Sequence, residues 1–367
     1  MRSPRIPLFD WLLSSASKTR YPLGFSNISG VSYEEYLGLT GFPVPSGFDL
    51  GADYPRGASE LREALAARYA CSPENIVTTS GGTEANFLVS SSLLSPGDEV
   101  IVEQPAYGPL WLTPQALGAR VVAWPRRFES QFQLDLEALP SLVSRRTRLI
   151  VLTNLHNPSG VLVPRATLQR VADLAAMYGL FVLVDEIFLD GAPSPQPSAF
   201  GLPNTLVTSS MSKVYGLGGL RTGWIVAPEQ VAVQCQSAKS HTTGASSGLS
   251  EALNARALSV GREALLERFR RRTQGNLTVV RDWVRGNPDL VEWVEPFGGT
   301  ICFPRYRVDV PSVRLCSEVL DSCGVLLAPG EHFFLDGHVR LGFGIDAGLL
   351  REGLALFGDF LRVRLNQ

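Results

Sequence analysis

Short apolar runs alternate with helical patterns through the middle of the 367-residue chain, and this alternation limits the fold more than any other feature. The runs DEVIVEQP, RLIVLTNL and LFVLVDEIF are continuously apolar, which is typical of strands covered on both faces. Helical patterns such as RATLQRVADLAAMYG lie between such runs. This order predicts an α/β protein with a mainly parallel sheet and helices on both sides.

Changes in sequence texture divide the chain into four expected segments. Residues 1–50 lack strong periodicity and are expected to form an N-terminal arm and part of a small domain. Residues 51–245 carry the alternating pattern of a large domain, and residues 246–285 read as a long connecting helix. Residues 286–367 mix short strands with helices, which predicts a smaller α+β domain.

Composition excludes several classes of protein. The net charge is −2 without blocks of like charge, so neither a nucleic-acid surface nor a membrane-attracting patch is indicated. No apolar run approaches the roughly 18 residues that span a bilayer, and the opening MRSPRIPLFDWLLSSASKTRYPL lacks a small-residue cleavage site. The five cysteines are scattered, which argues against a metal site or a disulfide framework. We therefore expect a cytoplasmic protein without a metal.

The residues that follow each predicted strand are the first candidates for a site, because ligands of open α/β sheets bind outside the carboxyl ends of the strands. In TTSGGTEANF (78–87), Gly82 and Thr83 open a helix directly after a strand. Free N–H groups at a helix start suit a phosphate. The alternative is a simple Gly-Thr helix cap.

Two further strand ends carry polar residues. Asn157 precedes a proline in NLHNPSG (154–160), a pattern that a turn alone would explain. Asp185 ends the apolar strand in LVDEIF (183–188), where a carboxylate is costly unless it is paired. It is either a loop aspartate or a charge held against a cationic ring nitrogen.

The fourth strand end, SSMSKVYGLGGLRTGW (209–224), contains one of the few lysines of an arginine-rich chain. A desolvated Lys213 could form a Schiff base with a carbonyl, although a solvated loop lysine is the ordinary alternative. Ser210 and Arg221 are natural phosphate partners. A phosphate cradle, an acid for a pyridinium nitrogen and a reactive lysine together indicate pyridoxal 5′-phosphate.

The order GGT-EA, aromatic, N-P-x-G, D-E-x-aromatic, S-K and a late arginine resembles the class I/II aminotransferases of fold type I over nearly the whole chain. HNPSG, GVLLAPGEHF and GGTICFPRY are most similar to a branch with capreomycidine synthase-like and archaeal aminotransferase-like proteins. The resemblance implies a mainly parallel seven-stranded sheet in a large domain, a smaller α+β domain, and pyridoxal phosphate as cofactor.

The resemblance also implies roles for individual residues. Lys213 would hold the cofactor covalently and then shuttle a proton, and Asp185 would pair with the ring nitrogen. Arg340, in HVRLGFG, would grip the substrate α-carboxylate. The remaining roles are contacts to the cofactor or substrate: Gly82, Thr83, Ser210 and Arg221 to the phosphate, Tyr107 stacking on the ring, Asn157 to the ring O3′ and the substrate carboxylate, and Gly30 to that carboxylate through its N–H.

Two positions depart from the family pattern. Phe188 stands where the family usually has a tyrosine that donates to O3′, so ordinary transamination is in question. Asn157 is then the remaining O3′ donor that the sequence identifies. Tyr54 stands three residues before Gly57, whereas the tyrosine that reaches the partner's phosphate usually stands five before a glycine. If Tyr54 makes that contact, the protein is a homodimer, and residues 241–244 (HTTG) would line the shared site.

Three functions follow from this sequence. The first is an aminotransferase that moves the amino group of an L-α-amino acid to a 2-oxo acid. The second keeps the cofactor but performs elimination, replacement or cyclisation, as Phe188 suggests. The third, the aminotransferase-like half of a transcription regulator, is disfavoured because the sequence has no basic patch. A nicotinamide-dependent dehydrogenase is also disfavoured, because no GxGxxG follows the first strand. The sequence does not name the amino acid.

Overall fold

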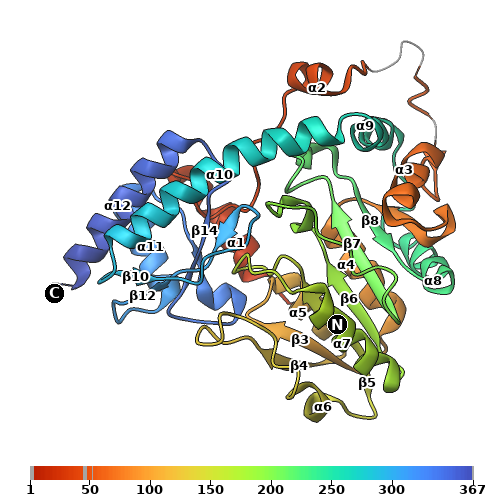
Figure 1. The fold of residues 1–367 in the computed structure, drawn as a ribbon, viewed down its shortest axis with the longest axis horizontal. Helices are drawn as coiled ribbons and strands as arrows, with labels where there is room; N and C mark the ends of the chain where they lie inside the picture. Colours follow the sequence, from red (N-terminus) through yellow and green to blue (C-terminus); the bar gives the residue numbers. More distant parts are fainter. Residues whose placement is uncertain (1–3, 44–47, 52, 366–367) are drawn as a thin grey trace.

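The computed structural model describes residues 4–43, 48–51 and 53–365 (Figure 1). Its main sheet has seven strands in the order β2-β8-β7-β6-β5-β3-β4. Strands β3 to β7 pair in parallel, and β8 runs antiparallel to both of its neighbours. The predicted α/β fold with a mainly parallel seven-stranded sheet is confirmed. The strands are β2 (Ile76–Thr79), β3 (Glu99–Gln104), β4 (Arg120–Pro125), β5 (Thr147–Thr153), β6 (Phe181–Asp185), β7 (Thr205–Ser210) and β8 (Gly223–Val226).

Successive side chains of these strands enter two separate apolar cores, one on each face of the sheet. On β5, for example, Leu149 and Val151 pack with one core, whereas Ile150 and Leu152 pack with the other. Burial on both faces explains why the strands read as continuous apolar runs. The covering helices of the large domain are α3 (Ser59–Tyr69), α4 (Gly82–Leu93), α5 (Gly108–Ala116), α6 (Leu139–Leu142), α7 (Arg165–Met177) and α8 (Glu229–Lys239).

A third core lies among the C-terminal elements, together with Tyr21 and Leu23 from the start of the chain. Its three-stranded antiparallel sheet has the order β11-β14-β13, with a separate β10-β12 pair. These elements are β10 (Val291–Glu292), β11 (Ile301–Cys302), β12 (Arg305–Tyr306), α11 (Ser312–Cys323), β13 (Ala328–Pro329), β14 (Val339–Gly342) and α12 (Ala347–Leu365). The mixture of short strands and helices agrees with the expected α+β texture.

The arm and the connecting segment differ in detail from the sequence interpretation. The arm contains two helices, α1 (Pro7–Ser14) and α2 (Tyr33–Thr40). The expected single helix over 246–285 is two helices, α9 (Gly248–Ser259) and α10 (Arg262–Gly286). They separate at Gly261, where a Cβ would lie 2.7 Å from Thr40 Cγ2, so the break lets α2 approach closely. A short antiparallel pair joins β1 (Asp53–Tyr54) to β9 (Ser246–Ser247), which directly precedes α9.

Candidate active site

Lys213 lies three residues beyond the end of β7 and is covered by the N-terminal arm. Its ammonium nitrogen donates to Ser26 Oγ at 3.0 Å and to Asn27 Oδ1 at 2.5 Å. The backbone carbonyl of Lys213 also accepts from the N–H of Ile28 at 3.4 Å. Burial, helped by the charges of Arg340 and Arg221, lowers the pKa of Lys213 to about 7 against the opposing effect of Asp185. Much of the amine is therefore neutral and nucleophilic near pH 7.

Asp185 ends β6, the strand next to β7, so its carboxylate reaches the same edge of the sheet as Lys213. One carboxylate oxygen accepts from Asn86 Nδ2 at 2.8 Å and the other from the N–H of Ile187 at 3.0 Å. Asn86 is oriented by Thr208, whose hydroxyl donates to Asn86 Oδ1 at 2.6 Å. Burial raises the pKa of Asp185 to about 6. A cationic ring nitrogen would stabilise the charged carboxylate here.

The start of α4 forms a compact cradle with Arg221. Gly81 precedes the helix with φ +89°, and a Cβ there would lie 2.4 Å from Arg221 Nη2. Arg221 donates to the carbonyls of Ser80 at 3.1 Å and Gly218 at 3.2 Å. Ser210 lies beside Gly82, with its Oγ 3.8 Å from where a Cβ would stand. A helix start with free N–H groups beside a guanidinium and a hydroxyl fits a phosphate.

Tyr107 is linked to this cradle. Its hydroxyl lies 3.4 Å from Thr83 Oγ1, the second residue of α4. Burial raises the pKa of Tyr107 to about 12, so its hydroxyl stays protonated at neutral pH. The edge of its ring contacts Phe9 of α1, with ring centroids 6.2 Å apart. The large-domain cradle and the arm therefore meet at this tyrosine.

Arg340 of β14 brings a buried positive charge from the C-terminal domain to the site. Its Nη2 donates to the carbonyl of Gly24 at 2.8 Å and its Nη1 to Asn157 Oδ1 at 3.3 Å. The side chain is 2% exposed, and its Nε has no partner among the residues that the structure describes. Phe333 packs against the guanidinium, 4.8 Å from ring centroid to Cζ. Burial lowers the pKa of Arg340 to about 10, so it remains a cation at neutral pH.

The predicted roles of two further residues involve a substrate or a partner subunit. The carbonyl of Gly30 accepts from Arg268 Nη2 at 2.8 Å, and the carbonyl of Gly24 accepts from Arg340. Tyr54 is 36% exposed and pairs with Ser246 across β1 and β9. The roles assigned to Gly30 and Tyr54 therefore remain predictions that no contact within this chain supports.

The HTTG segment does reach the start of α4. The hydroxyls of Thr242 and Thr243 donate to Glu84 Oε1 at 2.7 and 2.9 Å. The other oxygen of Glu84 accepts from the N–H of Ser80 at 2.5 Å, immediately before the glycine pair. Residues 241–244 are thus joined to the cradle through one glutamate side chain.

Phe188 is 1% exposed and forms a small apolar cluster with Leu155 and Ile301. The side chain of residue 188 therefore supplies no hydrogen-bond donor beyond the end of β6. Within the described part of the chain, no group of three His, Cys, Asp or Glu side chains could hold a metal ion. A search of the described helices also finds none that combines the length and apolar character needed to cross a membrane.

Sequence reasoning missed three contacts that complete the site. Asn86 was visible only as an amide within a helix, and its bond to Asp185 spans 99 residues. Ser26 and Asn27 come from an arm without periodicity, and their contacts with Lys213 also depend on long-range folding. The single sequence signal for any of these contacts was Asn86, a polar residue on the otherwise mainly apolar buried face of α4.

The observed groups fit pyridoxal phosphate in three respects. The glycines let the start of α4 and the Arg221 guanidinium come close together, because a Cβ at Gly81 would lie 2.4 Å from Arg221 Nη2. Among the residues that the structure describes, the buried Asp185 has no cationic partner in direct contact and Arg340 Nε has no hydrogen-bond partner. Each feature corresponds to a charged group of the cofactor or of an amino acid: phosphate, ring nitrogen and α-carboxylate. The same cluster of residues would otherwise carry uncompensated charge.

Comparisons with known proteins agree with this geometry. The model for aminotransferase class I and II matches residues 52–356. Capreomycidine synthase from Streptomyces vinaceus is 32% identical, covering 98% of this chain and 94% of the relative. A crystal structure of a PLP-dependent aminotransferase from Streptococcus suis has a TM-score of 0.94 at 31% identity, covering 99% of both chains. The PLP-dependent cyclase OrfR has a TM-score of 0.91 at 27% identity, covering 99% of this chain and 98% of its own.

The side chains of the site and the similarity across most of the chain agree on cofactor and fold. Pyridoxal phosphate supplies an electron sink for chemistry at the amino-acid α-carbon. The chain belongs to the class I and II aminotransferase family, whose members are PLP-dependent enzymes.

Proposed function

We propose that the protein is an aminotransferase that transfers the amino group of an L-α-amino acid to a 2-oxo acid, with Lys213 as its catalytic residue. The observation that carries the proposal is the convergence of a part-neutral lysine, a buried carboxylate and a buried arginine that has no counter-ion among the described residues. An amino acid and pyridoxal phosphate together would supply the groups that these three side chains lack.

Lys213 would hold the cofactor covalently and, as a free amine, would move the proton of the substrate α-carbon. Its lowered pKa suits both tasks, because the free amine can accept a proton near pH 7. The hydroxyl of Ser26 and the amide oxygen of Asn27 would hold the freed amine in reach by accepting its N–H groups. The arm residues therefore orient the base without titrating themselves.

The remaining groups bind and orient. Arg340 and Asn157 would hold the substrate carboxylate, and Asp185 would keep the ring nitrogen protonated. The other proposed contacts are Gly82, Thr83, Ser210 and Arg221 at the phosphate and Tyr107 over the ring. Tyr54, exposed at the surface, is proposed to reach the phosphate of a partner subunit, which would make the protein a homodimer.

Cyclisation, elimination or replacement on the amino-acid side chain is the second candidate function. Two observations favour it: the buried Phe188 in place of a hydroxyl donor, and the similarity to capreomycidine synthase and to the cyclase OrfR. Both candidates use Lys213, so they differ only in the products.

Product analysis separates the two candidates. Cofactor-loaded protein is mixed with a panel of amino acids in the absence of any 2-oxo acid, and 2-oxo acid, ammonia and cyclised product are quantified. Transamination should stop after one 2-oxo acid per site without ammonia, because no acceptor is present. Continuing turnover with ammonia or a cyclised product would overturn the aminotransferase proposal in favour of the alternative. Lys213→Ala should be inactive, with the exposed Lys18→Ala as the matched control.

A further inference from the structure

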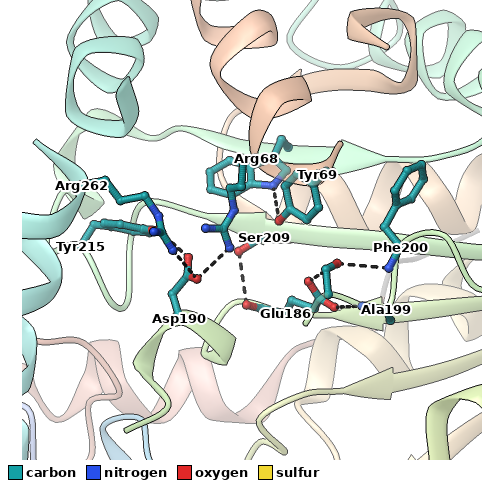
Figure 2. A network of polar contacts seen from close by, with 11 residues as sticks. Arg68, Tyr69, Glu186, Asp190, Ala199, Phe200, Ser209, Tyr215 and Arg262 are labelled. Carbon is teal, nitrogen blue, oxygen red and sulfur yellow. Dashed lines mark hydrogen bonds and ion pairs between the residues drawn. The ribbon is translucent and has the colours of Figure 1, made fainter. Parts of the chain in front are cut away.

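A large cavity lies away from the Lys213 site, between α3, the segment that follows β6 and the start of α10. Its volume is about 670 Å³, within the range of about 300–1,000 Å³ that is usual for small-molecule pockets. Arg68, Asp190 and Arg262 belong to its wall, and Figure 2 shows these three side chains converging with Tyr215. None of these residues has a role in the proposed reaction.

Two arginines share one carboxylate oxygen in this wall. Asp190 Oδ1 lies 2.7 Å from Arg68 Nη2 and 3.1 Å from Arg262 Nη2 (Figure 2). The other oxygen, Oδ2, accepts from the hydroxyl of Tyr215. Both oxygens of Asp190 are thus engaged, and one carboxylate faces two guanidiniums. The pair of arginines therefore carries one excess positive charge.

The charged neighbours of this pair are a third arginine of the wall and its two glutamates. Arg270 pairs with Glu263 at 2.6 Å and also lies 3.9 Å from Glu267, whose half-exposed carboxylate is screened by water. Glu186 is buried near Arg68, and burial raises the pKa of Glu186 to about 7. Its oxygens accept from Ser198 Oγ at 2.8 Å and from the N–H of Ala199 at 2.6 Å. Near neutral pH its charge is only partly formed.

Arg68 also has an unused donor. Its Nε is buried and has no hydrogen-bond partner in the described ranges of the chain. Leaving a buried donor unpaired costs about 1–3 kcal/mol. This nitrogen is itself closed to the cavity, so a ligand would meet Arg68 through the remainder of its side chain, which is 19% exposed. A guanidinium presents its N–H groups in a planar fork that matches a carboxylate.

The rest of the wall is largely apolar. It includes the side chains of Ala64, Ala67, Leu189, Leu258 and Leu266. An inorganic anion would leave this surface in contact with water. A ligand with a carboxylate at one end and a short apolar body would use both parts of the wall.

We propose that this cavity is a second binding site, which takes a small organic carboxylate with an apolar body and contacts its head group through Arg68 and Arg262. The proposal does not depend on the reaction at Lys213, because no group of the cavity belongs to that site.

Calorimetric titration with hexanoate tests the proposal. Cofactor-loaded Arg340→Met protein is used, because this change removes the carboxylate grip of the active site. We expect saturable binding of one hexanoate per chain. Arg262→Gln should weaken binding at least tenfold. Ala67→Trp, which places a bulky side chain at the cavity from an exposed position of α3 and replaces none of the charged residues, should abolish it. Arg314→Gln, an exposed arginine elsewhere, is the control.

The outcomes are decisive in both directions. Hexanol should not bind, because it lacks the charge that the two arginines recognise. Absence of saturable hexanoate binding, equal binding of hexanol, or hexanoate affinity unchanged in Ala67→Trp would each overturn the proposal. Because Ala67→Trp replaces no residue of the Asp190 network, it still tests the proposal if Arg262→Gln fails to fold.

Discussion

Replacing Arg340 by methionine should damage substrate use while leaving the fold intact. Within the described residues, Arg340 bonds only to two neutral acceptors, Gly24 O and Asn157 Oδ1, and its Nε is unpaired. A buried charge without a counter-ion destabilises a fold. Removing it therefore offsets the loss of the two hydrogen bonds, and we expect the free energy of unfolding without substrate to change by less than about 1 kcal/mol.

The effect on catalysis should be much larger. A substrate carboxylate would form two charge-assisted hydrogen bonds with the guanidinium, each contributing about 1.5–3 kcal/mol. Their loss, about 3–6 kcal/mol in total, corresponds to about 10²–10⁴-fold in kcat/KM at roughly 1.4 kcal/mol per tenfold. Steady-state kinetics with the best amino acid of the panel measures kcat/KM. Urea unfolding measures stability.

Arg126 supplies the matched control for this experiment. It is as deeply buried as Arg340 but pairs with the buried Glu103 at 2.6 Å. Arg126→Met leaves Glu103 without its partner and should lower the free energy of unfolding by about 3–5 kcal/mol. Equal destabilisation by the two substitutions, or kcat/KM within twofold of wild type in Arg340→Met, would refute the reasoning.

Three other predictions concern the site. Acylation of Lys213 in the cofactor-free protein should rise with pH to half its plateau near pH 7, because its pKa is lowered to about 7 and only the neutral amine reacts; mass spectrometry of its peptide measures this, and a midpoint above about pH 9 would contradict it. Asp185→Asn should lower kcat about 10²–10³-fold at saturating cofactor, because an amide cannot hold a charged ring nitrogen; unchanged kcat would argue against that pairing. Phe188→Tyr should lower the Tm of the cofactor-free protein, because the new hydroxyl enters the apolar cluster with Leu155 and Ile301. Cofactor should restore part of this Tm loss if its ring oxygen accepts a hydrogen bond from the tyrosine. A Tm loss that cofactor leaves unchanged would place the hydroxyl away from O3′.

The local patterns of the chain were sufficient to predict the sheet and the strand-end residues. Asp185 and Lys213 follow adjacent parallel strands, and parallel strands deliver their carboxyl ends to one edge. Their proximity thus follows from topology alone. Arg340 required the family resemblance, because its position on β14 relative to the large domain depends on how two separate cores pack.

Contacts between distant segments could not be predicted in the same way. Asn27 reaches Lys213 across 186 residues from a segment without regular periodicity. The division at Gly261 was also hidden, because helical periodicity continues on both sides of the glycine and the reason for the break is the close approach of Thr40. In both cases the deciding interaction is tertiary, and no local propensity encodes it.

Borohydride reduction of the cofactor-loaded protein addresses the role of Lys213 itself. The chain has three lysines, Lys18, Lys213 and Lys239, so peptide mass spectrometry can assign the modified residue without ambiguity. Reduction should abolish the absorbance near the visible edge and leave the mass of the reduced cofactor on Lys213 alone, with none in Lys213→Ala. A reduced cofactor on Lys18 or Lys239, or no covalent addition to a protein that has bound the cofactor, would contradict the assignment of Lys213 as the cofactor-binding lysine.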